Sequence, residues 1–302
     1  MIERSLSETL QSVSSGSGCA VLVEGEERGG DAWILQNTLR ESGGEVTFYG
    51  RDGRDNLLAE LPHFVEAFPQ GKVAVILDRD FANDDFVEKT YSPEYEGVVF
   101  YWRRYCIENY LLEPALVSQC VEIAFAQYPE QTPKTLSSTQ AIERFLLEQC
   151  KKVASQVAGN FTIDELTRIS DSQELNVKAA KYFQAQTELD AAFVLSEMMQ
   201  KYQDAATLHP NIFGKEAMSA RYENNLKKVL LQVSSLDMAH RVIDGKRFLM
   251  PFVKRELKAF SRFFVSLLVH EVAPKNPPQD FRYLVQDRIL PRWREARRLA
   301  QQ

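Results

Sequence analysis

The chain has 302 residues, of which 44% are hydrophobic, and its formal net charge is −6 at pH 7. This length suits one large domain or two ordinary ones, and no apolar run is long enough to cross a membrane. The acidic balance gives no global attraction to nucleic acid, so such binding would need local basic patches, metal ions or a partner. The polar, amphipathic start does not resemble a signal peptide, and the expected location is the cytoplasm.

The four cysteines are scattered through the chain at Cys19, Cys106, Cys120 and Cys150. None has the CxxC spacing of a zinc site, and the pattern is not that of a disulfide framework. We therefore predict reduced thiols in the protein core.

The first third of the chain alternates between predicted strands and helices. Helices are expected over residues 3–14, over 32–42 and over 56–68. Strands are expected at 19–23, 45–50, 73–77 and 98–102, separated by turn-rich segments. This alternation is typical of an α/β fold with right-handed parallel crossovers. The strand at 73–77 is apolar without alternation, as in strands that are buried on both faces of a sheet.

Carboxylates follow two of these strands directly. Glu24 ends the first strand, and Asp78 and Asp80 follow the strand at 73–77. Ligands of open α/β sheets bind at the carboxyl ends of the strands, and residues two apart on an extended chain point the same way. Clustered carboxylates repel each other unless a cation lies among them, and oxygen ligands favour Mg²⁺ or Mn²⁺. The pattern therefore predicts a metal site formed by Glu24, Asp78 and Asp80.

From Pro114 onward the pattern becomes helical, with 3.6-residue periodicity over 115–128, 137–159, 164–203 and 223–233. A turn at Asp244 and Gly245 precedes Lys246, and an arginine-rich helix ends the chain. We predict a metal-binding α/β core over residues 1–114 and an all-α second half over 115–302.

A strand that ends in Glu-Gly and a strand that ends in Asp-x-Asp, within one small βαβ unit, resemble the Toprim domain of topoisomerases, primases and OLD-type nucleases. The resemblance implies a Toprim-like parallel-sheet core with helices on both faces. It also implies acid–base chemistry or metal binding by Glu24, and Mg²⁺ binding by Asp78 and Asp80.

OLD-like nucleases carry a further acidic residue in the pattern VEGxxD. Here Arg28 stands at that position. Either Asp31 or Glu27 would therefore complete a second metal site. Asp31 could equally be the N-cap of its helix.

Two later motifs resemble a Toprim subfamily that accompanies ATPases in bacterial anti-phage systems such as PARIS. They are the segment CIENYLLEP at 106–114 and the DGK at 244–246. The resemblance implies a nuclease effector that an ATPase partner holds inactive, that acts on host RNA such as tRNA after release, and that forms a homodimer. The short element around 243–250 would return to the active site, where Lys246 would stabilise charge on the scissile phosphate.

Other polar groups have two interpretations each. Glu108 and Asn109 either cap a helix or support the carboxylate site from the same edge of the sheet. Arg103 and Arg104 either form an ion pair and a surface group or bind phosphate. The C-terminal arginines form either a solvated face or a surface for RNA or the partner. They are Arg292, Arg294, Arg297 and Arg298.

The expected function is metal-dependent hydrolysis of phosphodiester bonds. RNA as the substrate rests on the family analogy alone. One alternative is an OLD-type DNA nickase or nuclease with the same metal site. Another is a non-catalytic interaction subunit with a decayed Toprim core, which the arginine at position 28 favours.

Overall fold

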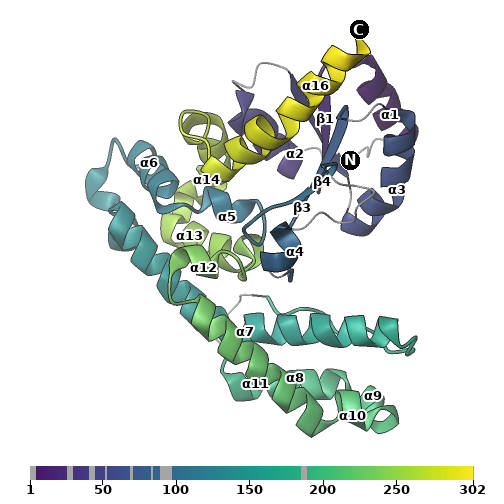
Figure 1. Ribbon diagram of the computed structural model, residues 1–302. Coiled ribbons are helices and arrows are strands. Elements are labelled where there is room, and N and C mark those ends of the chain that lie inside the picture. Colours follow the sequence, from purple (N-terminus) through teal and green to yellow (C-terminus); the bar gives the residue numbers. More distant parts are fainter. Residues whose placement is uncertain are drawn as a thin grey trace. The chain divides into compact units, whose positions relative to one another are not determined.

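The computed structural model (Figure 1) describes residues 5–25, 30–40, 45–51, 53–68, 71–82, 84–88, 97–184 and 189–301. The chain divides into two compact units. The first contains residues 1–120 and 263–302, and the second contains residues 121–262. No helix in the described part of the chain has both the length and the apolar character of a membrane span.

Within the described residues, the first unit contains a sheet of four parallel strands in the order β2–β1–β3–β4. The strands are β1 (Cys19–Glu24), β2 (Val46–Arg51), β3 (Val73–Leu77) and β4 (Val99–Tyr101). All residues of β3 are buried, and so are those of β1 before Glu24. Because Val23 pairs with Ile76, β1 and β3 end at the same edge of the sheet. The predicted parallel α/β core is confirmed.

Helices cover both faces of this sheet. On one face, Val13 of α1 (Leu6–Ser15) and Phe64 of α3 (Arg54–Ala67) pack in one core cluster with Leu22 and Val75. Successive strand side chains alternate, so Val21 points to the other face. There α2 (Asp31–Thr38) contacts β1 and β2. The rest of the unit contains α4 (Asp84–Glu88), α5 (Glu108–Leu111), α14 (Phe264–Leu267), α15 (Gln279–Arg282) and α16 (Leu290–Ala300), and the chain passes to the second unit within α6 (Pro114–Ala124).

The C-terminal helix α16 packs against the turn that precedes β3. A Cβ atom at Gly71 would lie 2.9 Å from the backbone oxygen of Arg292. The Nζ atom of Lys72 lies 5.1 Å from the ring centroid of Trp293, and Arg294 forms an ion pair with Glu45. These contacts explain why residues 263–302 belong with the sheet, whereas the sequence placed them in a separate helical half.

A second set of contacts joins the C-terminal segment to the end of β4. The ring of Phe281 lies 5.1 Å from the rings of both Trp102 and Tyr110. The hydroxyl of Tyr110 donates to Asp280 Oδ2 at 2.9 Å and accepts the backbone N–H groups that follow Trp102 at positions 103 and 104. Helical periodicity identifies the inward face of such a segment but not the layer that it packs on.

The cysteines are free and buried, as predicted. Burial raises the pKa of the Cys19, Cys120 and Cys150 thiols to about 12, so they stay protonated at neutral pH.

The second unit is helical. Its longest helix, α7 (Thr139–Ser172), packs along α11 (Lys215–Gln232). The other helices are α8 (Ala191–Lys201), α9 (Gln203–Leu208), α10 (Pro210–Phe213), α12 (Leu236–Ala239) and α13 (Met250–Leu257), which follows the helical turn η5 (Gly245–Leu249).

The helix predicted over 164–203 is interrupted. After α7 ends, Glu174 has a left-handed φ of +52°, and residues 175–184 have no regular secondary structure. The side-chain amide of Asn160 donates to the Phe183 carbonyl at 3.1 Å and accepts its N–H at 2.6 Å. A Cβ at Gly159 would lie 2.9 Å from the Phe183 ring, so glycine leaves room for it. Sequence periodicity missed the break because it depends on this tertiary contact.

The docking of α16 can be tested with two glycines of similar conformation. Gly71 and Gly53 have φ values of +83° and +74°, a region that costs other residues about 1–2 kcal/mol. Nothing lies within 4 Å of a Cβ at Gly53, whereas at Gly71 the Arg292 backbone is in the way. We expect Gly71→Ala to lower the free energy of unfolding in urea by about 2–4 kcal/mol, and Gly53→Ala by about 1 kcal/mol. Equal losses would contradict this packing of α16.

Candidate functional site

The carboxylates of Glu24 and Asp78 meet at the carboxyl edge of the sheet. Glu24 is the last residue of β1, and Asp78 directly follows β3. The backbone N–H of Asp78 donates to Glu24 Oε1 at 3.0 Å. The parallel register of the two central strands therefore brings these sequence-predicted residues together, as the pattern indicated.

Asp31 reaches the same edge from the other side of the strand-to-helix turn. It is the first residue of α2 and is only 7% exposed. A Cβ at Gly25 would lie 3.7 Å from Asp31 Oδ1, so the carboxylate lies beside the residue that follows Glu24. The N-cap is Gly30, and the N-cap interpretation of Asp31 is wrong because its backbone is already helical. Glu27, the other candidate for a second metal site, lies outside the described residues.

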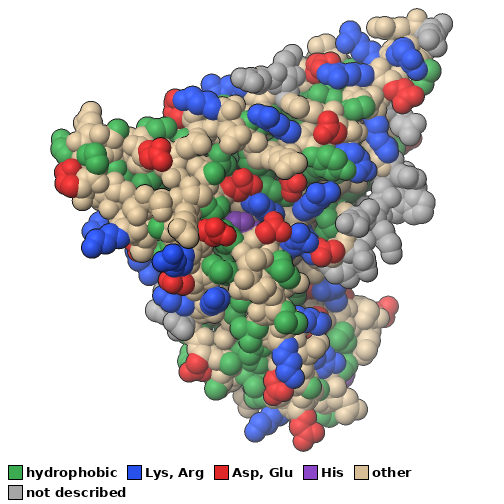
Figure 2. All heavy atoms as spheres, turned by 60° about the vertical axis from the view of Figure 1, so that its left-hand side comes forward, with side chains coloured by type: hydrophobic (Ala, Val, Ile, Leu, Met, Phe, Trp, Pro, Cys, Tyr) green, Lys and Arg blue, Asp and Glu red, His purple; other side chains and the backbone are tan. Residues whose placement is uncertain are grey.

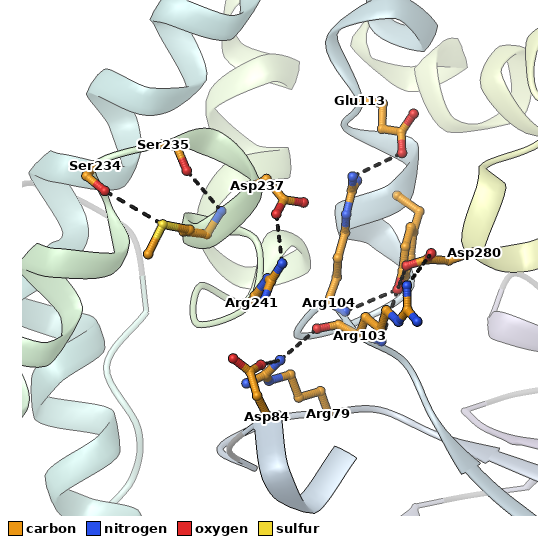
Figure 3. Close-up of polar contacts among 12 residues, drawn as sticks. Arg79, Asp84, Arg103, Arg104, Glu113, Ser234, Ser235, Asp237, Arg241 and Asp280 are labelled. Atoms are coloured by element: carbon orange, nitrogen blue, oxygen red, sulfur yellow. Dashed lines mark hydrogen bonds and ion pairs between the residues drawn. The ribbon is translucent and has the colours of Figure 1, made fainter. Parts of the chain in front are cut away.

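Asp80 is held in an unusual backbone conformation. Its φ of +48° is left-handed, a region that aspartate tolerates better than most residues. The strand has ended at Leu77, so the sequence argument that Asp78 and Asp80 point the same way on an extended chain is wrong in detail. The intervening Arg79 is 5% exposed and donates to the carbonyls of Ala82 and Arg103, both at 2.9 Å. Figure 3 shows this side chain beside Asp84, with which it forms an ion pair of 2.6 Å.

Arg54 is the functional candidate that the sequence reading missed. It is the first residue of α3, after Gly53. Its Nε lies 3.3 Å from Glu24 Oε1, and one terminal nitrogen lies 3.0 Å from Asp80 Oδ2. The same terminal nitrogen donates to the backbone oxygen of Asp78. A cation from the protein itself thus bridges the carboxylates.

The electrostatics of the site are dominated by burial. Burial raises the pKa of Asp78 well above its usual range, and the nearby charges of Asp31, Glu24, Asp80 and Glu108 raise it further. Burial also raises the pKa of Glu24, an effect that Arg54 opposes. One oxygen of Asp78, Oδ1, is buried and has no hydrogen-bond partner. A buried carboxylate with an unsatisfied oxygen is unstable unless it is protonated or binds a cation.

This donor set suits a hard divalent cation, because every group is a carboxylate oxygen. Among the described residues, however, no three His, Cys, Asp or Glu side chains are grouped closely enough to hold a metal ion as they stand. The guanidinium of Arg54 lies between Glu24 and Asp80. An added cation would be stabilised most by contact with the unsatisfied Asp78 oxygen.

The IENYLL motif forms the support beneath this edge. Asn109 is completely buried, with Arg104 donating to its backbone oxygen at 3.0 Å and the Cys106 thiol donating to its Oδ1 at 3.5 Å. Tyr110 is the buried residue that fastens the C-terminal segment. Glu108 is the member of the motif whose charge acts on Asp78.

Arg103 and Arg104 have different surroundings. Arg104 is 16% exposed and forms an ion pair with Glu113 at 3.1 Å (Figure 3). Its guanidinium lies over the Tyr110 ring. Arg103 is 61% exposed and lies 3.9 Å from Asp280. Of the two arginines, Arg104 therefore has the predicted role of an ion-pair residue. The more exposed Arg103 is better placed to contact a phosphate.

The remaining predicted residues lie away from this cluster or in the other unit. Arg294 pairs with Glu45, and the guanidinium of Arg292 fills the space over Gly97. Arg297 and Arg298 lie on the exposed side of α16. On the face drawn in Figure 2, basic and acidic side chains are interspersed and form no single basic patch. Lys246 belongs to the second unit, in η5, and the approach of residues 243–250 to the active site stays a prediction.

No protein-family model matches the chain, and a search of curated proteins found no significant match. The Toprim resemblance therefore depends on the motifs themselves.

Asp78→Asn is expected to stabilise the metal-free protein in a pH-dependent way. The folded protein binds the Asp78 proton more tightly than the unfolded chain does, because the pKa is raised on folding. The stability from this residue is thus full below about pH 4 and is lost as the pH rises through the raised pKa. In EDTA we expect Asp78→Asn to gain about 0.5–2 kcal/mol at neutral pH and less at low pH, measured by urea denaturation.

The matched control is Glu143→Gln, which removes an exposed carboxylate on α7. It should change the free energy of unfolding by less than about 0.5 kcal/mol at every pH. A loss of stability in Asp78→Asn at neutral pH would contradict the buried, partly unsatisfied carboxylate.

Proposed function

We propose that the protein is a metal-dependent phosphodiesterase with a Toprim-like core that cleaves nucleic acid. The observation that carries the proposal is the Asp78 carboxylate, which is buried with one unsatisfied oxygen among Glu24, Asp31 and Asp80 at the carboxyl edge of a parallel sheet. A structural role does not require acidic groups to be gathered here, whereas binding one or two Mg²⁺ or Mn²⁺ ions does.

Each residue has a chemical role in this proposal. Glu24, Asp78 and Asp80 would hold the first ion, and Asp31 or Glu27 would complete a second site. A bound divalent ion would activate water and stabilise the leaving oxygen. Glu24, whose pKa is raised by burial, would be the carboxylate that exchanges a proton with the reacting groups. Lys246 would add positive charge at the scissile phosphate.

Substrate and partners follow from the family resemblance. Through the IENYLL and DGK motifs it favours host RNA, with tRNA as the first class to test, and an ATPase partner that holds the nuclease inactive until infection. It also favours a homodimer. The alternatives are an OLD-type DNA nickase and a non-catalytic interaction subunit. The second is supported by the arginine that bridges Glu24 and Asp80.

The proposal predicts cleavage that depends on both the ion and the carboxylates. Purified protein is incubated with total tRNA or supercoiled plasmid, in Mg²⁺, in Mn²⁺ or in EDTA. We expect fragments of tRNA only with the ions. Glu24→Gln and Asp78→Asn should each lower the rate by at least about 100-fold, because both remove groups that act on the reacting centre. Glu143→Gln is the control and should cleave at the wild-type rate.

Induced expression gives a second measurement with the same variants. Wild type alone should arrest growth and fragment small RNA, whereas Glu24→Ala and Asp78→Ala should be silent, and co-expression of the ATPase partner should relieve the arrest. Nicked plasmid with intact tRNA would favour the DNA nickase. Variants as toxic as wild type would favour the interaction subunit.

A further inference from the structure

Arg54 contacts the same carboxylates that the proposed metal site uses. Its guanidinium lies 3.3 Å from Glu24 Oε1 and 3.0 Å from Asp80 Oδ2, and it donates to the Asp78 backbone oxygen. Glu24 stands at the end of β1 and Asp80 stands beyond the end of β3, so Arg54 contacts both sides of the site. The arginine therefore takes the electrostatic place of a bound cation.

A guanidinium is nevertheless an incomplete substitute for a metal ion. It donates hydrogen bonds in one plane from a fixed fork, whereas a divalent ion draws oxygens from all directions. In the structure it neutralises Glu24 and Asp80 but leaves Asp78 Oδ1 buried and without a partner. The innermost carboxylate, Asp78, therefore still has a buried oxygen to which a second cation could bind.

We propose that Arg54 is an internal counter-ion which a divalent metal ion must displace from Glu24 and Asp80. The inference rests on the metal site of the proposed function and adds its regulation. The oxygens that Arg54 occupies are not available as metal ligands while it is bound to them, so the two cations compete. While Arg54 makes these contacts, the chain's own arginine blocks both oxygens.

The position of Arg54 allows it to leave. Its side chain is 30% exposed, although its Nε atom is buried. It extends from the first residue of α3, next to Gly53, where the helix meets the edge of the sheet. Rotation of the side chain toward solvent breaks two ion pairs and the hydrogen bond to the Asp78 backbone oxygen. Asp80, its outer partner, is 35% exposed.

Metal binding by the purified, EDTA-treated chain tests the inference. Isothermal titration with Mn²⁺ compares wild type, Arg54→Gln and Arg54→Lys. Removing the competing cation makes every molecule competent to bind, so Arg54→Gln should bind Mn²⁺ about tenfold more tightly. Arg54→Lys keeps the charge and should bind within about threefold of wild type. Arg40→Gln, a control with the same charge change at an exposed site, should leave the affinity unchanged.

A second readout uses the wild-type chain alone. Phenylglyoxal modifies accessible guanidinium groups, and peptide mass spectrometry gives the extent at Arg54. Displacement predicts faster modification of Arg54 in saturating Mn²⁺ than in EDTA, with no change at Arg40. If Arg54→Gln does not fold, this measurement alone tests whether the metal ion displaces Arg54.

The outcomes separate the two proposals. If wild type binds Mn²⁺ and cleaves nucleic acid, but Arg54→Gln binds no more tightly, or Arg54 is no more reactive with the ion, displacement is overturned and the nuclease proposal stands. If neither wild type nor Arg54→Gln binds Mn²⁺, the metal site and the inference fail together. Tighter binding without cleavage supports displacement and overturns the nuclease proposal.

Discussion

The candidate site depends on carboxylates held together at the end of a buried parallel sheet. The register of β1 and β3 is fixed by strands whose apolar residues are almost fully buried, so Glu24 and Asp78 are not free to separate. Bringing like charges together with little water is unfavourable. The fold reduces this cost by two means, the Asp78 N–H that binds Glu24 and the guanidinium of Arg54. The stability of the hydrophobic core thus maintains a local arrangement that is unfavourable by itself.

Two buried polar side chains, Arg79 and Tyr110, connect the site to the surrounding loops and helices. Arg79 fixes the turn after β3 through the carbonyls of Ala82 and Arg103. Tyr110 accepts the next two backbone N–H groups after Trp102 and donates to Asp280, which joins the end of β4 to the C-terminal segment. The motif that most resembles the anti-phage Toprim subfamily is therefore largely a scaffold. Its Glu108 is the residue whose charge acts on Asp78.

The sheet and the meeting of Glu24 with Asp78 were predictable from sequence, because buried parallel strands have a distinct apolar pattern and end at one edge. Arg54 was not predictable, because it comes from a third element whose distance from the carboxylates depends on tertiary structure. The placement of residues 263–302 on the sheet was missed for a related reason. Their periodicity specifies an apolar stripe, while contacts such as Arg292 against Gly71 specify the layer. The break after α7 likewise depends on Asn160 and Phe183, which are distant in sequence.

The site is divided into a fixed inner part and a more accessible outer part. Glu24 and Asp78 are bound to each other at the ends of the central strands, and Asp78 Oδ1 is shielded from water. Asp80 and Arg54 are each about one third exposed, and Asp80 has a left-handed backbone that the Arg79 contacts hold in place. A cation that enters from solvent meets the outer pair first. Water can solvate the exposed parts of both groups when that ion pair breaks, whereas moving either inner carboxylate would disturb the sheet. In the proposed displacement, exchange of one cation for another would therefore begin at Asp80.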